Sequence, residues 1–89
     1  MASLPIPADT YFSDFKFDLI EYAVMRDGAH VITAKGLTNS NKKGNYVAFP
    51  IAAKLQVGDI LQSKQQRFLV KSIEYDSYKG EDQIINAYY

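Results

Sequence analysis

The sequence predicts an all-β fold, a small antiparallel barrel of the SH3 or OB kind with five to six short strands. Three observations lead to this class. An Asp27-Gly28 pair separates two runs suited to a hairpin, a Gly58-Asp59 turn precedes three short apolar runs, and the 89-residue chain has room for one small core. We therefore expect one domain over residues 1–89, with an N-terminal arm and turn in 1–15 and the barrel in 16–89.

The first segment is expected to be an extended arm and not a strand, because Pro5 and Pro7 fix their own φ angles and bias the residues before them. A short helical turn capped by Asp9 or Thr10 is expected to follow it. The aromatic spacing from Tyr11 onward also fits a longer helix, so residues 9–25 leave helix and strand open. We favour a strand over Phe17–Met25, since it leads into the Asp27-Gly28 hairpin signal.

The first hairpin has a predicted register. Counting outward from Asp27-Gly28 opposes Met25 to His30 and Val24 to Val31. The same count opposes Ala23 to Ile32 and Tyr22 to Thr33. Val24, Val31, Tyr22 and Thr33 would then share one face, with Ala23, Ile32, Leu19 and Ala34 on the other.

The remaining elements follow the turn signals. Strands are expected over 29–36, 46–49, 60–63, 67–75 and 83–88, with a turn of helix or 3₁₀ helix near Ile51–Gln56. Pro50 is expected at a strand end or sheet edge. Gly80 supplies the left-handed position of the last hairpin, whose flanking Glu74, Asp76, Glu81 and Asp82 are expected to form a solvated acidic rim.

A polar segment between Leu37 and Tyr46 has no apolar side chain and is expected to be a loop, either solvated or involved in recognition. In the second case Lys42 and Lys43 would form a basic finger, with Asn39, Asn41 and Asn45 as further contact residues. The chain ends in Tyr88 and Tyr89, which either close the barrel against the first hairpin or contact a partner; closure is favoured.

The composition of the chain argues against several classes of function. Ten basic and ten acidic side chains give a formal charge of zero, which argues against a dedicated polyanion binder. There is no cysteine, and His30 is the lone histidine, so a thiolate or multi-histidine metal site has no ligands. Asp59 and Gly58 fit a turn better than a catalytic site. We expect no enzymatic activity, no cofactor and no bound metal.

Aromatic residues make up 13% of the chain, enough to raise the question of a nucleic-acid stacking platform. Lys64, Arg67 and Lys71 lie in or near one predicted hairpin. However, Arg67 and Lys71 share a strand face with Leu69, Ile73 and Tyr75, while Phe68, Val70 and Ser72 take the other face. The aromatics are therefore expected to fill the barrel, with tyrosine hydroxyls directed to water. A signal peptide and a membrane-length apolar run are both missing, so we expect a soluble protein that is not exported and makes no membrane contact.

The segment Leu55-Gln56-Val57-Gly58-Asp59-Ile60-Leu61, followed by Arg67–Ile73 and a final strand, resembles the small β-barrel proteins of tailed-phage head–tail joints and their prophage relatives. The resemblance covers about a third of the chain. It implies a non-enzymatic neck or tail component that self-associates into a ring or assembles with other virion proteins. The same resemblance implies a location in the cytoplasm of a bacterial host or in the virion. It also implies that the arm at Pro5 and Pro7 and the loop Asn39 to Asn45 contact neighbours. A small nucleic-acid-binding barrel and an accessory regulatory module of a mobile element remain the alternatives.

Overall fold

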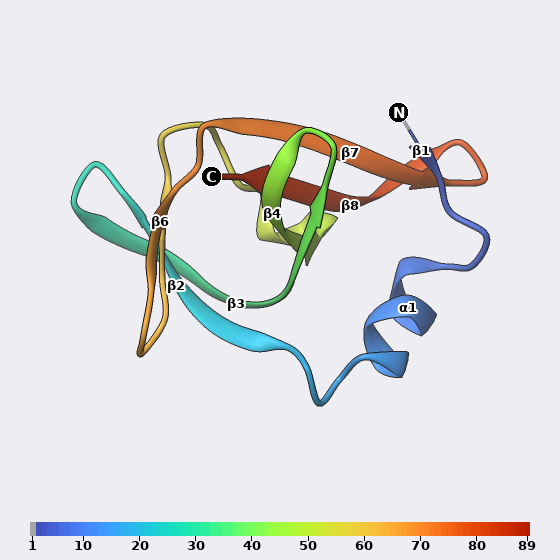
Figure 1. Ribbon diagram of the computed structural model, residues 1–89, viewed down its shortest axis with the longest axis horizontal. Helices are drawn as coiled ribbons and strands as arrows, with labels where there is room; N and C mark the ends of the chain where they lie inside the picture. The colour runs from blue at the N-terminus through green and yellow to red at the C-terminus, as the bar shows by residue number, and fades with distance from the viewer. Residues whose placement is uncertain (1) are drawn as a thin grey trace.

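The chain folds into a curled, barrel-like β-sheet preceded by one short α-helix, which confirms the predicted all-β class (Figure 1). The structure is a computed structural model and describes residues 2–89. Its elements, in chain order, are β1 (Ala2–Ser3), α1 (Ala8–Asp14), β2 (Ile20–Arg26), β3 (Ala29–Asn41), β4 (Gly44–Pro50), the 3₁₀ helix η1 (Ile51–Ala53), β5 (Ile60–Gln62), β6 (Arg67–Leu69), β7 (Ser72–Tyr78) and β8 (Glu81–Tyr88). Within residues 2–89, no helix has the length and apolar character needed to cross a bilayer.

The N-terminal segment is bound to the sheet, so its prediction as an arm without a strand is wrong at its first residues. β1 pairs in parallel with β7, and the Leu4 N–H donates to the Ser77 carbonyl over 2.6 Å. Pro7 then precedes α1 as its N-cap, and neither predicted capping side chain is used. Instead, the side chain of Gln83 on β8 accepts a hydrogen bond from the Ala8 N–H at 2.9 Å. A partner from the sheet thus satisfies a free N–H of the first helical turn.

Both alternatives for residues 9–25 are partly realised. The helix ends at Asp14, a run of turns follows, and β2 begins at Ile20, three residues later than predicted. Of the aromatic residues in this stretch, Phe12 is buried against the sheet, while Phe15 is 41% and Phe17 91% exposed. The helix stops where its aromatic face no longer has a sheet surface to cover.

The predicted register of the first hairpin holds only at its tip. Met25 lies opposite His30, but Val24 pairs with Ile32, Ala23 with Thr33 and Tyr22 with Ala34. A β-bulge between Val24 and Met25 leaves Val31 without an opposite residue, and Val31 is exposed. The one-residue shift places Ile32 and Ala34, instead of Val31 and Thr33, opposite the buried β2 residues.

Strand β3 continues five residues past its predicted end and bends as it does so. Its first part, up to Gly36, pairs with β2, and its second part, from Leu37, pairs with β4. A Cβ at Gly36 would lie 2.5 Å from Val47 Cγ1 and 2.7 Å from Phe49 Cε1. Glycine therefore allows the bent strand to pass over the core side chains of β4 without a clash.

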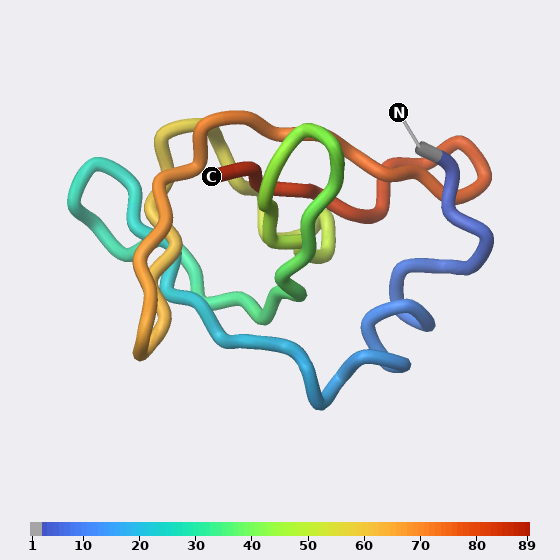
Figure 2. The backbone as a smooth tube through the Cα atoms, in the orientation of Figure 1, coloured from blue at the N-terminus to red at the C-terminus, as the bar shows by residue number. Residues whose placement is uncertain are grey.

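The predicted strand over Arg67–Tyr75 is divided into β6 and β7 by a change of partner. The Val70 N–H donates to the Asp59 carbonyl, and the following Lys71 N–H donates to the Tyr88 carbonyl. β6 pairs with β5, and β7 pairs with β8. The sheet order is β1-β7-β8-β4-β3-β2-β5-β6, so one continuous piece of chain joins two distant parts of it, as the tube in Figure 2 shows.

The inner side of the curled sheet is filled by side chains from both halves. Tyr22, Val24, Val47, Phe49, Leu61 and Ile85 are among its buried members. The hydroxyl of Tyr22 is buried and has no hydrogen-bond partner among the described residues, which contradicts the expectation that the tyrosine hydroxyls point to water. A second, smaller cluster joins Ala8 and Phe12 of α1 to Ala48 and Ile84 on the outer side.

Candidate functional site

The outer face of the sheet formed by β4, β8 and β7 is half apolar and half polar. The register places Ala48 opposite Asn86, and Asn86 opposite Glu74, so these three side chains share one face. Along β8 the same face runs from Ile84 through Asn86 to Tyr88. Helix α1 covers the Ile84 end, and the Tyr88 end is open to the β3–β4 hairpin.

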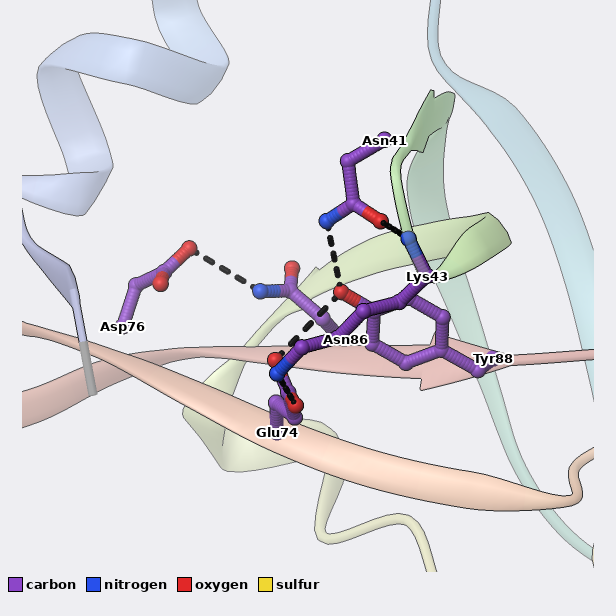
Figure 3. A network of polar contacts seen from close by, with 6 residues as sticks. All are labelled: Asn41, Lys43, Glu74, Asp76, Asn86 and Tyr88. Carbon is purple, nitrogen blue, oxygen red and sulfur yellow. Dashed lines mark hydrogen bonds and ion pairs between the residues drawn. The ribbon is translucent and has the colours of Figure 1, made fainter.

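The open half forms a polar depression of about 660 Å³ (Figure 3). It combines carboxylate, amide, ammonium and phenol groups from β7, β8 and the β3–β4 hairpin. We define it by its eight lining residues: Asn41, Lys43, Tyr46, Glu74, Tyr75, Asp76, Asn86 and Tyr88.

One side of the polar depression is held by a chain of polar contacts between strands distant in sequence. The Asn41 amide donates to the Tyr88 hydroxyl at 2.8 Å, and this hydroxyl in turn lies 3.4 Å from Glu74 Oε1. Lys43 reaches from the hairpin to Glu74 Oε2 and forms an ion pair with it. The hairpin is therefore tied to both β8 and β7.

Asn86 lies at the buried floor of the polar depression, with 5% of its surface exposed. Its Nδ2 donates to Asp76 Oδ2 at 2.9 Å, which fixes the orientation of the amide. Its Oδ1 is buried and has no hydrogen-bond partner among residues 2–89. Since most buried side-chain oxygens accept a hydrogen bond, Asn86 Oδ1 is an unused acceptor in this site.

Charged neighbours and burial shift the pKa values of groups in and near the polar depression. The hydrogen bond from Lys43 lowers the pKa of Glu74, and the same contact raises the pKa of Lys43. Burial, with a smaller effect from the Asp76 carboxylate, raises the pKa of Tyr11 at the edge of the site. Burial likewise raises the pKa of Tyr46. At neutral pH the site therefore holds ionised Glu74 and Lys43 beside the neutral phenol of Tyr46.

Comparison of the chain with known protein families, curated proteins and solved structures finds no match. The site must therefore be interpreted from its own geometry. Among the residues that the structure describes, no three acidic or histidine side chains gather closely enough to hold a metal ion.

The predicted interaction residues separate into two groups. Asn41, Lys43 and Tyr88 come together in the polar depression. The predicted loop that carried two of them is wrong, because β3 and β4 continue as a paired ribbon from Leu37↔Ala48 to Asn41↔Gly44, with only Lys42 and Lys43 at the turn. The ribbon forms despite its polar sequence because its backbone groups pair with one another and β4 is anchored on β8.

The other predicted interaction residues lie apart from the polar depression. Lys42 and Pro5 are exposed, Pro7 precedes α1, and the Asn39 side chain accepts from the Ser40 N–H. The Asn45 carbonyl accepts from the Tyr89 N–H, and the Tyr89 ring stacks on Phe68 with centroids 3.8 Å apart. Tyr89 thus packs against β6 and the core, and β8, which ends at Tyr88, pairs with β4 and β7 and not with the first hairpin. The expected closure by the terminal tyrosines therefore occurs through side-chain packing and not through strand pairing with that hairpin.

The residues expected in turns occupy turns. Asp27 and Gly28 both have positive φ, as do Gly58 and Gly80. Asp59 accepts from the Gln56 N–H at 2.9 Å, the local contact expected of it. It also forms a buried two-pronged ion pair with Arg26, at 2.8 Å for both contacts, which the sequence analysis missed.

The expected solvated acidic rim holds for Glu81 and Asp82, which are exposed, and is wrong for Glu74 and Asp76, which line the polar depression. His30 is exposed and contacts Thr33 Oγ1 at 2.9 Å.

A second surface that the sequence analysis missed lies beside α1. We call residues 15–19 the aromatic loop, because it carries the exposed Phe15 and Phe17. Next to it is an apolar groove of about 260 Å³, lined by Phe12, Leu19, Ile32, Ala34, Lys35, Pro50, Ala52 and Ala53. The Phe-x-Phe spacing was available as a signal, but it was assigned to a helix or strand face.

Proposed function

We propose that this protein is a non-enzymatic assembly component that self-associates through protein–protein contacts, as the neck or tail part of a tailed phage or prophage. The observation that carries the proposal is Phe17, a large apolar side chain that is 91% exposed. Aromatic side chains of this kind serve as anchors in protein interfaces, where they are buried by the partner.

The surroundings of Phe17 support the proposal. Phe15, two residues earlier, is also partly exposed, and the apolar groove lies beside the same loop through Phe12 and Leu19. In Figure 1 the link between α1 and β2 extends away from the curled sheet. A projecting aromatic residue and an apolar groove on one chain allow copies of that chain to bind one another.

Nucleic-acid binding has less support from the site. Lys43, one of the two cations of the predicted basic finger, is paired with Glu74. Phe68 stacks on Tyr89 and is only partly exposed, so its ring is not a free platform for a base. The assembly function is therefore the one that the exposed groups favour.

Light scattering after gel filtration, over a wide range of protein concentration, tests self-association. We expect the mass to rise above that of one 10.0 kDa chain, and Phe17→Ser to restore the single-chain mass. Val57→Ser is the matched control, since Val57 is 63% exposed but lies on the turn before β5. A wild-type mass of one chain at every concentration would contradict self-association, and a limit of two chains would contradict a ring.

A further inference from the structure

The starting point is the unused acceptor at the floor of the polar depression. Asn86 is almost fully buried, and its amide is held by Asp76, yet its Oδ1 receives no hydrogen bond from residues 2–89. Buried side-chain oxygens usually accept a hydrogen bond, and the described residues supply no donor for this one. The missing partner must carry at least one hydrogen-bond donor.

The charge balance of the site points to a cation. Among its eight lining residues, Glu74 and Asp76 contribute two negative charges and Lys43 one positive charge, which leaves one net negative charge. Lys43 is directed to Glu74, and Asp76 accepts from the neutral Asn86 amide. The Asp76 carboxylate and the Asn86 carbonyl, which we call the acceptor pair, therefore have no cationic partner among the lining residues.

The shape of the acceptor set favours a planar cation over a metal ion. Hard divalent cations in proteins bind through several oxygen ligands, and here only two carboxylates are present, with no metal-holding cluster among the described residues. A guanidinium group offers several N–H donors in one plane and pairs well with adjacent oxygens. The ring of Tyr46, which lines the site and is partly exposed, adds an aromatic surface of the kind on which guanidinium groups stack.

Access to Asn86 Oδ1 requires a movement, because the atom is not solvent-exposed in the structure. Displacement of Lys43 from Glu74 would provide this movement. Both side chains are exposed, at 65% and 43%, and Figure 3 shows Lys43 extending from the hairpin across the site to β7. Exposed pairs of this kind contribute little stability, so Lys43 can be replaced at low cost.

We propose that the polar depression binds an alkyl guanidinium group, which donates to Asn86 Oδ1 and the Asp76 carboxylate and competes with Lys43 for the site. The group is either a free small molecule or the arginine side chain of a polypeptide. The site is separate from the aromatic loop, so this proposal does not depend on self-association.

Binding is tested by NMR titration of the ¹⁵N-labelled full-length chain. The probes are agmatine, which carries a free alkyl guanidinium, and the capped peptide Gly-Arg-Gly; the peptide with citrulline in place of arginine is the neutral isostere. We expect saturable shifts of the Asn86 side-chain amide, and of the backbone amides around it, with at least one guanidinium probe, and none with the citrulline peptide. Binding of agmatine without the peptide indicates a small-molecule site, and binding of the peptide indicates an arginine residue as the ligand.

Four variants locate the site. Asp76→Asn and Asn86→Leu should each weaken binding about tenfold, because each removes part of the acceptor pair. Lys43→Met should tighten binding about twofold to fivefold by removing the competing ammonium. Asp18→Asn, an exposed acid on the aromatic loop, makes the same charge change as Asp76→Asn and should alter the affinity less than about twofold.

The exposed Lys43→Met variant keeps the test valid if Asn86→Leu fails to fold. The proposal is overturned if neither guanidinium probe shifts the wild-type or Lys43→Met protein. It is also overturned if the citrulline peptide binds equally well, if Asp18→Asn weakens binding as much as Asp76→Asn, or if Ca²⁺ saturates the site and guanidinium does not.

Discussion

Two ion pairs join hairpins of this protein to segments distant in sequence, and they differ in almost every physical respect. Arg26 binds Asp59 through two 2.8 Å contacts, and the Asp59 side chain is only 1% exposed. Lys43 binds Glu74 with both side chains substantially exposed. Asp59 is enclosed by the scaffold and Arg26 is half-buried, while the second pair lies over a site. Burial of a carboxylate decides which of the two pairs is costly to break.

The largest expected effect comes from removing the cation of the buried pair. Arg26→Ala leaves the Asp59 carboxylate buried without its charged partner, and we expect a large loss in the free energy of unfolding, well above that of Lys43→Ala. Urea denaturation monitored by circular dichroism measures it. The double variant Arg26→Ala/Asp59→Asn should be more stable than Arg26→Ala alone, because it removes the unpaired charge. If Arg26→Ala costs no more than Lys43→Ala, the contrast between the two pairs is wrong.

Substitution of Gly36 tests the close approach of β3 to β4, at the point where β3 changes its partner from β2 to β4. Gly36→Ala places a methyl group into Val47 and Phe49, and we expect a loss of about 1–3 kcal/mol from overpacking. Thermal and urea unfolding measure the loss. In the Val47→Ala background part of it should be recovered, since the closest contact is removed. Full stability of Gly36→Ala would contradict the close approach of β3 to β4.

The pH dependence of the free energy of unfolding tests the Arg26–Asp59 pair, because its sign should change when Arg26 is removed. Burial opposes ionisation of Asp59, but the hydrogen bonds from Arg26 and the Gln56 N–H lower its pKa overall. A carboxylate whose pKa is lowered in the folded state stabilises the fold at pH values above its ordinary pKa. This stabilisation is lost as the pH falls below about 4. In Arg26→Ala only burial and the Gln56 contact remain, so the folded-state pKa should rise and mild acid should stabilise this variant. Urea midpoints between pH 7 and pH 3 measure both slopes; equal slopes would contradict the assignment.

The smallest expected effect belongs to the exposed pair. Lys43→Ala should change the free energy of unfolding little, because solvent and salt screen both charges. Lys42→Ala, at the same turn, is the matched control. Unfolding measured at low and high salt should show any difference between these variants shrinking at high salt. A loss as large as that of Arg26→Ala would mean that the hairpin is held mainly by this pair.

The parts of the fold that the sequence predicted are those governed by local signals. Asp27-Gly28, Gly58 and Gly80 mark turns because few other residues accept positive φ, and the apolar runs beside them mark strands. The Val31 bulge and the division at Val70 have no such signal, since each follows from the partner that the strand meets. The polar ribbon of β3 and β4 was missed because its stability comes from backbone pairing and not from its own side chains.

The candidate site was only partly predictable for a related reason. Asn41, Lys43 and Tyr88 were chosen for their exposure or terminal position, and the structure does bring these three together. Asn86 was missed because it stands in an apolar run, where alternation alone does not reveal that its amide faces a polar partner. Arg26 and Asp59 are 33 positions apart, so their contact required the folded hairpin.

Two segments of the chain pair with two different parts of the sheet, and this affects how the molecule unfolds. β3 pairs with β2 before Gly36 and with β4 after it, and the chain through Val70 and Lys71 changes from β5 to β8. Detaching either half of the sheet therefore disrupts a strand that the other half uses. Amide protons on both sides of the bends should exchange with deuterium at similar, slow rates, as members of one cooperative unit, while those of β1 and the aromatic loop exchange earlier.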